Sequence, residues 1–387
     1  MILINAKIYT MTSDKPIDKG YVKINGKTIV SVGKMSDAEQ STDEKVIDLK
    51  GARVYPGFID AHTHLGIYED GLTFEGDDLN ETTEPVTPNL RAIDAANPMD
   101  RCFAEAIAAG VTTVLISPGS TNPIAGQIAA IKTAGRRIDD MIIKAPVGIK
   151  MSMGENPKGN YSEKEQSPVT RMAVAALIRE TLAKARRYAK DKQDALKNPD
   201  EHTLPDYDSK LEALVPLIKG EIKPYFHAHR ADDIFTAIRI ANEFKLKPVI
   251  IHGTEGHLIA QELAQENVPV LSGPFMCDRP KPELSNQTPA SPGIMTKNGV
   301  KTAIVTDHNV IPIQYLPICA ALAVKHGMSE YDALKAITVN PAEICGISDR
   351  VGTIEAGKDA DIVIMDKSPL DFTAAPSMVF ISGKRVL

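Results

Sequence analysis

Two histidines separated by one residue, His62 and His64, end an apolar run near the start of the chain. In an extended strand the side chains of residues i and i+2 point to the same face, so two imidazoles at this spacing can be directed at one point. A Pro-Gly pair precedes the run and a Leu-Gly pair follows it, which places the histidines at the C-terminal end of a buried strand. Because neutral imidazole is the commonest protein ligand for metal ions, the pair predicts a metal site. Two hydrogen-bonded core histidines are the structural alternative.

Further candidate ligands follow other apolar runs of the sequence. They are His227, His252 and Asp307, together with either Lys150 or Glu155. In an α/β barrel, residues at the carboxyl ends of several strands meet at one mouth, so ligands dispersed in sequence are expected there. An aspartate after a strand can also cap a helix, which is the alternative for Asp307. The set as a whole predicts a metal centre at a barrel mouth.

The middle of the chain, residues 55–345, alternates apolar runs typical of strands with helical patterns, which predicts a parallel sheet. A helix is expected over 101–109, closed by Gly110, and a strand over 111–116. Residues 171–190 have apolar side chains at spacings of three and four, which predicts a long helix. The fold class is therefore α/β, a (β/α)8 TIM barrel.

Both ends of the chain read as short strands joined by turns. Residues 20–33 alternate around Asn25-Gly26, a dipeptide typical of a type I′ hairpin turn. Residues 362–366 and 379–386 supply further strands near the C-terminus. We expect residues 1–54 and 346–387 to form one small β-sandwich domain beside the barrel of residues 55–345.

The composition excludes several classes of function. The 387 residues carry a net charge of −6, which argues against a protein that binds a nucleic-acid backbone. No apolar run approaches the length of a membrane span. The four cysteines are scattered without a CxxC spacing, so neither a zinc ribbon nor a disulfide framework is indicated. We expect a cytoplasmic protein with a small-molecule substrate, and its composition is compatible with a homo-oligomer.

The run from Pro56 to His64 resembles the first-strand signature of the amidohydrolase superfamily. His227, His252 and Asp307 match that family's ligands after strands five, six and eight, and the terminal β segments resemble its composite sandwich. The match covers nearly the whole chain, and the subgroup is similar to imidazolonepropionase-related and cyclic-amide hydrolases. The resemblance implies hydrolysis of a C–N bond outside a linear peptide backbone, in a cyclic amide, an N-acyl group or a dipeptide-like amide.

Together the resemblance and the residue types suggest one or two divalent ions. His62, His64 and Asp307 would hold one ion, and His227 and His252 a second. Two such ions activate a shared hydroxide and polarise the scissile carbonyl. Asp307 would take the proton of this nucleophile and deliver it to the leaving nitrogen, as general base and then acid. Zinc is the expected metal, although Mn²⁺, Fe²⁺ and Co²⁺ also suit mixed imidazole and carboxylate ligands.

A carboxylate from the fourth strand would bridge the ions, and two residues compete for that role. Residues 148–154 resemble the family stretch whose lysine becomes carboxylated, which would make Lys150 the bridge. Glu155 offers a carboxylate without modification.

Three residues are candidate substrate contacts. His229 lies two residues after His227 and would either touch substrate or replace His227 as a ligand. Arg279 and Lys281, in the loop after the seventh strand, would pair with a substrate carboxylate or simply be solvated charges. A deaminase with one metal ion is the alternative enzyme. A barrel without catalysis, serving as a binding or scaffold protein, is the alternative of another class.

Overall fold

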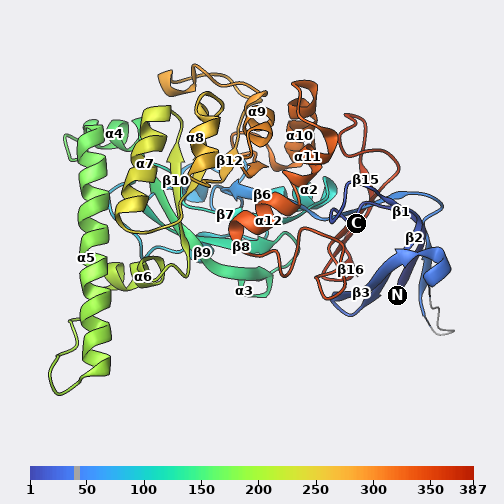
Figure 1. The fold of residues 1–387 in the computed structure, drawn as a ribbon, viewed down its shortest axis with the longest axis horizontal. Coiled ribbons are helices and arrows are strands. Elements are labelled where there is room, and N and C mark those ends of the chain that lie inside the picture. The colour runs from blue at the N-terminus through green and yellow to red at the C-terminus, as the bar shows by residue number, and fades with distance from the viewer. Residues whose placement is uncertain (39–43) are drawn as a thin grey trace.

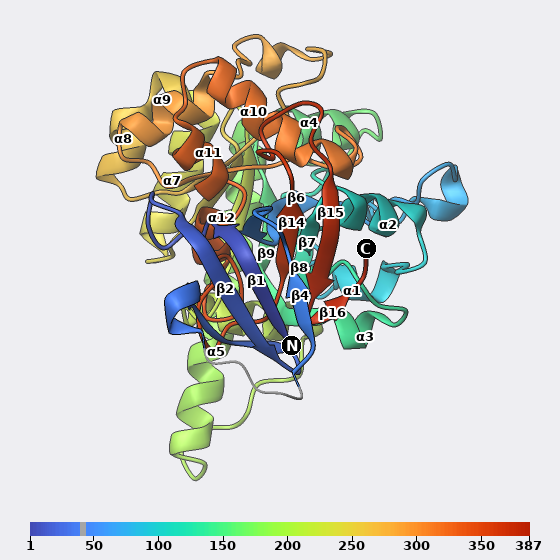
Figure 2. The ribbon, with the colours of Figure 1, turned by 90° about the vertical axis from the view of Figure 1, so that its right-hand side faces the viewer.

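Two eight-stranded sheets organise the computed structural model, which describes residues 1–38 and 44–387 (Figures 1 and 2). The sheet nearer the termini has the strand order β16-β15-β14-β5-β1-β2-β3, with β4 paired to β1. Its strands are β1 (Ile2–Ile8), β2 (Ile17–Asn25), β3 (Thr28–Lys34), β4 (Val46–Asp48), β5 (Arg53–Pro56), β14 (Ile362–Met365), β15 (Pro376–Ile381) and β16 (Lys384–Arg385).

This sheet joins the two ends of the chain through an antiparallel pairing of β14 with β5. The expected hairpin is present, because β2 and β3 pair antiparallel on either side of Gly26, whose φ is 57°. The described strands form one continuous sheet, so their pairing does not confirm the two-layer sandwich. The expected domain limits, 1–54 with 346–387 and 55–345, stay a prediction.

The second sheet forms the barrel, with the strand order β13-β12-β11-β10-β9-β8-β7-β6. Its strands are β6 (Phe58–Thr63), β7 (Val111–Ile116), β8 (Ile124–Lys132), β9 (Ile142–Ser152), β10 (Lys223–Ala228), β11 (Val249–His252), β12 (Val270–Ser272) and β13 (Thr302–Ile304). Beyond the end of β13 the backbone N–H of His64 donates to the carbonyl oxygen of His308 at 2.6 Å, which draws β6 toward the last strand. The architecture is that of a TIM-like barrel.

One strand departs from the expected alternation of strands and helices. β8 pairs antiparallel with both β7 and β9, and no helix separates it from β7. Parallel neighbours need a crossover of a dozen or more residues, whereas β7 and β8 are joined only by residues 117–123. The short connection therefore reverses the chain, and residues 124–132, which we had not expected to form a strand, complete the barrel.

The helices lie around the barrel, mainly beside β9 to β13 (Figure 1). They are α1 (Ala92–Ala95), α2 (Arg101–Ala108), α3 (Ile138–Met141), α4 (Glu155–Ser162), α5 (Arg171–Lys197), α6 (Ser209–Ile218), α7 (Ala231–Glu243), α8 (Ala260–Gln265), α9 (Ser291–Lys297), α10 (Leu316–Lys325), α11 (Glu330–Lys335) and α12 (Val339–Cys345). Short 3-10 turns are η1 (Met35–Asp37), η2 (Phe74–Gly76), η3 (Gly256–Leu258), η4 (Pro282–Leu284) and η5 (Ile313–Tyr315).

Helix α5 is longer than the expected span of 171–190. It runs to Lys197 because no glycine or proline interrupts it before Pro199, and Ala195 in its last turns is buried. Asn198 therefore marks the end of the helix, as expected for a residue before a proline.

Gly57 separates the two sheets. The Pro56-Gly57 pair was expected to precede the strand that ends in the histidines, and it does so, because β5 ends at Pro56 and β6 begins at Phe58. A Cβ atom at Gly57 would lie only 2.0 Å from Thr112 Oγ1 on β7, so this close crossing requires glycine. The break directs β6, with all six residues buried, into the barrel wall.

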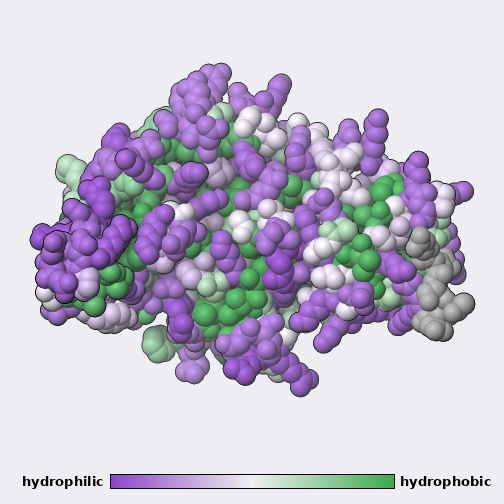
Figure 3. All heavy atoms as spheres, turned by 60° about the horizontal axis from the view of Figure 1, so that its bottom comes forward, coloured by the Kyte–Doolittle hydropathy of each residue, from purple (hydrophilic) through white to green (hydrophobic). Residues whose placement is uncertain are grey.

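The surface is largely polar. The face in Figure 3 is predominantly hydrophilic, with hydrophobic residues in small groups between charged ones. Across residues 1–38 and 44–387, none of the helices combines the length and the apolar character that a bilayer crossing demands.

Candidate metal centre

The histidine pair at the end of β6 converges on Asp307, which follows β13. Asp307 Oδ1 lies 3.1 Å from His62 Nε2 and 3.4 Å from His64 Nε2. His64 Nδ1 lies 2.7 Å from the carbonyl oxygen of Ser117. Because a carbonyl only accepts, Nδ1 carries the proton and Nε2 keeps its lone pair for a ligand. His62 Nε2 is buried and makes no hydrogen bond, as a ligand nitrogen awaiting an ion would be.

A second group lies at the ends of the next two strands that carry histidines. His227 is the penultimate residue of β10, His229 directly follows that strand, and His252 is the last residue of β11. One nitrogen from each of the three lies within 4.8 Å of the others. His252 Nδ1 donates to the carbonyl oxygen of Gly273 at 2.7 Å, and Thr254 Oγ1 lies 2.7 Å from His229 Nδ1. These contacts leave the two Nε2 atoms to face the centre.

The two groups adjoin one another. The ring centroids of His62 and His252 are 5.5 Å apart, and those of His227 and His252 are 4.5 Å apart. His227 Nδ1 is buried without a hydrogen-bond partner. Five imidazoles and one carboxylate with free lone pairs fit a centre for one or two divalent ions of the zinc type.

Burial sets the protonation state of this centre. It lowers the pKa of His62, His227 and His229 well below the ordinary value, and that of His252 to about 4. Burial alone would raise the pKa of Asp307, but the imidazoles of His252, His62 and His64 hold it well below its usual range. At neutral pH the imidazoles of His62, His227, His229 and His252 are neutral and Asp307 is ionised, which is the state that binds a cation.

A buried carboxylate beneath the centre positions the first group. Asp60 Oδ1 accepts from the backbone N–H of His62 at 3.2 Å. Its Oδ2 accepts from the N–H and the hydroxyl of Thr306, at 3.1 Å and 2.6 Å. Asp60 therefore ties the end of β6 to the residue before Asp307. We had not singled it out from the sequence, although a charge within an apolar strand was a usable signal.

Two of the ligand residues have left-handed backbones. The φ of His252 is 72° and that of Asp307 is 55°, in a region that non-glycine residues seldom adopt. Such strain persists where the surrounding structure demands it and is concentrated at functional sites. Here the two residues lie at the end of β11 and just after β13, at the mouth of the barrel.

Of the two candidate bridges, Lys150 has the more central place. It is fully buried on β9, and its Nζ donates to the carbonyl oxygen of Pro118 at 3.3 Å. Burial lowers the pKa of Lys150 to about 8, against the opposing effect of Asp307. The positive charge of Lys150 in turn lowers the pKa of His62 and His227, one from each group.

Glu155, the other candidate bridge, is the first residue of α4 and is only half-buried. Its carboxylate is in neither of the two candidate ligand groups found among the described residues. Its backbone N–H instead donates to Glu283 Oε2 at 3.2 Å.

The two basic candidates of the loop after β12 lie differently. Arg279 is exposed and donates to the carbonyl oxygen of Gln287 at 3.0 Å. Lys281 points inward, with its Nζ 2.7 Å from Asn156 Oδ1 and 2.8 Å from Glu283 Oε1. Lys281 is thus the one of these two cations that reaches the centre.

Glu283, in η4, is a site residue that our sequence reasoning missed. It is 3% exposed, and its Oε1 lies 3.6 Å from His229 Nε2 and 4.0 Å from His227 Nε2. It follows no strand directly and belongs to no periodic pattern. The only signal was a carboxylate in a long loop at the expected mouth.

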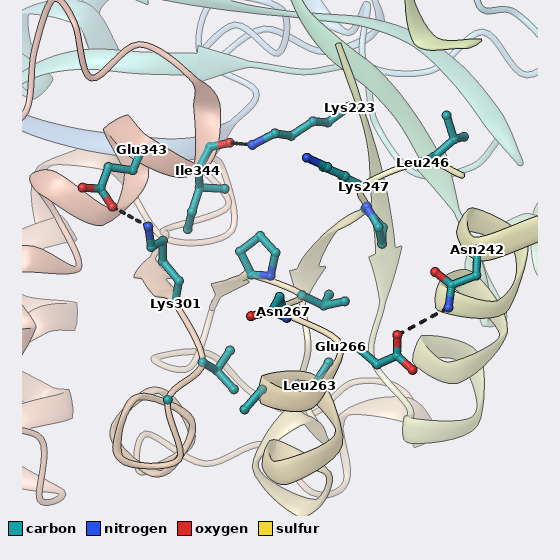
Figure 4. Close-up of a pocket in the computed structure, with 16 residues that line it drawn as sticks. Lys223, Asn242, Leu246, Lys247, Leu263, Glu266, Asn267, Lys301, Glu343 and Ile344 are labelled. Atoms are coloured by element: carbon teal, nitrogen blue, oxygen red, sulfur yellow. Dashed lines mark hydrogen bonds and ion pairs between the residues drawn. The ribbon is translucent and has the colours of Figure 1, made fainter. Parts of the chain in front are cut away.

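A cavity of about 590 Å³ lies at the opposite end of the barrel strands (Figure 4). Its wall includes Lys223, the first residue of β10, and Lys301, which precedes β13. Lys301 pairs with Glu343 at 2.5 Å, and Lys223 donates to the carbonyl oxygen of Ile344 at 2.6 Å. The lining contains no histidine, so this cavity lacks the donors of the centre at the mouth.

Comparison with known proteins gives consistent matches. Residues 53–386 match the Amidohydrolase family. The chain is 30% identical over 376 residues to amidohydrolase tasK of Hapsidospora irregularis, covering 90% of this chain and 38% of that protein. It is 25% identical over 385 residues to an imidazolonepropionase of Symbiobacterium thermophilum, covering 87% and 81%. A solved amidohydrolase from Thermotoga maritima MSB8 superposes with a TM-score of 0.95 at 41% identity, covering 100% of this chain and 99% of that one.

Proposed function

The chain belongs to the amidohydrolase family, and from this premise we propose that it hydrolyses a C–N bond of a small molecule in a metal-dependent reaction. The substrate we propose is a cyclic amide, an N-acyl compound or a dipeptide-like amide. Zinc is the proposed ion, and the cytoplasm the proposed location.

One observation carries the proposal. The nitrogen atoms of His62 and His64 both face a single oxygen of Asp307, at 3.1 Å and 3.4 Å, and the pKa of Asp307 is held well below its usual range, so this carboxylate is ionised. If this contact were only structural, a neutral residue in place of the aspartate would serve better. Burying an ionised carboxylate is costly unless an ion or hydrogen-bond donors compensate it.

A divalent ion held by these residues would lower the pKa of a water molecule and polarise a carbonyl group. Asp307 is ionised and placed at the mouth, where it would take up a proton transiently at a carboxylate oxygen and return it to a leaving nitrogen. Its side chain is 14% exposed, so a substrate can reach it from the mouth.

We propose carboxylated Lys150 as the bridge between the two groups. With a pKa of about 8, a substantial fraction of Lys150 is a neutral amine near neutral pH. A neutral amine adds to carbon dioxide and releases one proton, which replaces an ammonium by a carbamate anion. That exchange would remove a positive charge that disfavours a further cation beside His62 and His227.

The experiment is chelation followed by reloading. Metal-free protein should lose hydrolysis of a panel of N-acyl amino acids, cyclic amides and dipeptides, and Zn²⁺ should restore it. Ammonia release from an aminated heterocycle, at one metal per chain, would instead indicate the mononuclear deaminase. A panel unaffected by chelation would contradict the proposal.

A further inference from the structure

Glu283 is a buried carboxylate that the proposed reaction does not use. It comes from η4, in the loop after β12, rather than from a strand end. Its side chain is 2% exposed, yet its Oε1 faces the Nε2 atoms of His229 and His227 at 3.6 Å and 4.0 Å. A carboxylate aimed at two imidazoles in this way needs an explanation, because burial of such a charge is costly.

The spacing of these atoms suits the coordination of an ion. Two ligand atoms that each lie ~2.1 Å from one ion at a tetrahedral angle are about 3.4 Å apart. The separations of Glu283 Oε1 from the two nitrogens are close to this value. His252 contributes a third imidazole, because one nitrogen each of His227, His229 and His252 lies within 4.8 Å of the others. Three imidazoles and one carboxylate are a ligand set that zinc accepts.

The surroundings hold Glu283 in place with one oxygen presented. Oε2 accepts from the backbone N–H of Glu155 at 3.2 Å. A Cβ atom at Gly154 would lie 2.9 Å from that oxygen, so the absence of a side chain there makes room for the carboxylate. Oε1 is directed at the Nε2 atoms of His229 and His227 and lies beside the Lys281 ammonium.

Lys281 provides a cation at that oxygen. Its Nζ lies 2.8 Å from Glu283 Oε1 and is held from the other side by Asn156 Oδ1 at 2.7 Å. The Lys281 side chain is 26% exposed, whereas that of Glu283 is 2% exposed. The Lys281 ammonium pairs well with a carboxylate but poorly with neutral imidazoles. A metal ion would bind both the imidazoles and Glu283 Oε1, so it would compete with Lys281 for that oxygen.

We propose that Glu283 is the carboxylate ligand of a second divalent-metal subsite with His227, His229 and His252, and that the Lys281 ammonium neutralises Glu283 when that subsite is empty. The proposal rests on the proposed function, since it assigns a second ion to the same centre. In this proposal Glu283, in the loop after β12, supplies the negative charge of the second subsite whether or not Lys150 is carboxylated.

The test counts metal ions in full-length protein stripped with a chelator and titrated with Zn²⁺. Wild type should bind two equivalents of Zn²⁺. Glu283→Gln should bind the first equivalent as wild type does, and its Kd for the second should rise by about 100-fold or more. Glu343→Gln is the matched control, because Glu343 pairs with Lys301 far from the centre. It should bind Zn²⁺ as wild type does. Thermal melting of each variant verifies its fold.

Lys281→Met keeps Glu283 and removes the competing cation, so it tests the proposal even if Glu283→Gln does not fold. In this variant the Kd of the second Zn²⁺ equivalent should fall by roughly 10-fold. An unchanged second Kd in either folded variant would overturn the proposal. So would wild type that binds one equivalent only, which leaves the hydrolase function standing. Wild type that binds no Zn²⁺ would overturn the function as well.

Discussion

The two halves of the candidate metal centre are built in different ways. His62, His64 and Asp307 come from the ends of two neighbouring barrel elements that backbone hydrogen bonds and Asp60 hold in register. The half around His229 depends on Glu283, which a loop and the start of α4 hold in place. The first half therefore follows from strand geometry, whereas the second follows from the conformation of a loop. In the first the carboxylate pairs with two histidines, and in the second it lies against two histidines and pairs with Lys281.

The largest effect should come from the carboxylate of the first half. Asp307→Asn keeps the shape of the side chain but removes its proton affinity and its charge. We expect kcat/KM to fall by about 10³-fold or more in steady-state assays of the Zn²⁺-loaded enzyme. Glu343→Gln, which changes a surface ion pair in the same way, should retain wild-type activity. A loss of less than about 10-fold in Asp307→Asn would contradict its role in proton transfer.

A second prediction concerns the histidines of the other half in the metal-free protein. The pKa of His252 is about 4 in the folded chain and near 6.5 in the unfolded chain, so the unfolded chain takes up its proton first as the pH falls. This contribution to the free energy of unfolding is complete above pH ~6.5 and is lost progressively toward pH ~4. We expect a loss of about 3 kcal/mol from this residue.

Urea unfolding of metal-free wild type and His252→Asn at several pH values measures this loss. Because the asparagine does not titrate, the wild type should lose more stability on acidification than the variant. The same pH dependence in both proteins would show that His252 is protonated as readily in the folded state as in the unfolded state.

A smaller effect, confined to Zn²⁺ binding by the first half, should follow from a change at Asp60. Asp60→Asn weakens the attachment of His62 to Thr306 without touching any ligand of the second group. The Kd of the first Zn²⁺ equivalent should rise by about 10- to 100-fold, while that of the second stays near wild type. Calorimetric titration resolves the two equivalents. An equal change in both would mean that the halves are not built independently.

The smallest effect should distinguish the two cations of the loop. Lys281→Ala should raise KM for a carboxylate-bearing substrate by about 10-fold, because its ammonium reaches the centre. Arg279→Ala should change KM by less than about 3-fold, since its guanidinium is exposed and binds a backbone carbonyl of the same loop. Equal effects of the two changes would contradict this difference in placement.

The same contrast explains how far the sequence alone was informative. The His-x-His pair was readable because strand side chains alternate with a period of two, and the strand-end position indicated the mouth. The α/β class and the barrel followed from the alternation of apolar runs with helical patterns. Gly57 was noted only as a turn signal, because its close approach to Thr112 joins residues far apart in sequence.

Features set by tertiary contacts were not readable. β8 runs antiparallel because its connection to β7 is short, and no local pattern distinguishes that strand from a parallel one. His229 was considered mainly as a substrate contact, because its place next to His252, with ring centroids 4.6 Å apart, depends on how β10 and β11 end. Glu283 was missed because the conformation of the loop that carries it is not encoded in periodicity.

The most direct test of the central claim is the zinc content of folded protein, by elemental analysis, for wild type and a His62→Ala, His64→Ala double variant. Wild type should retain at least one equivalent after exhaustive dialysis, and the double variant should lose the equivalent that supports hydrolysis. A double variant that keeps the full metal content and activity of wild type would contradict the account.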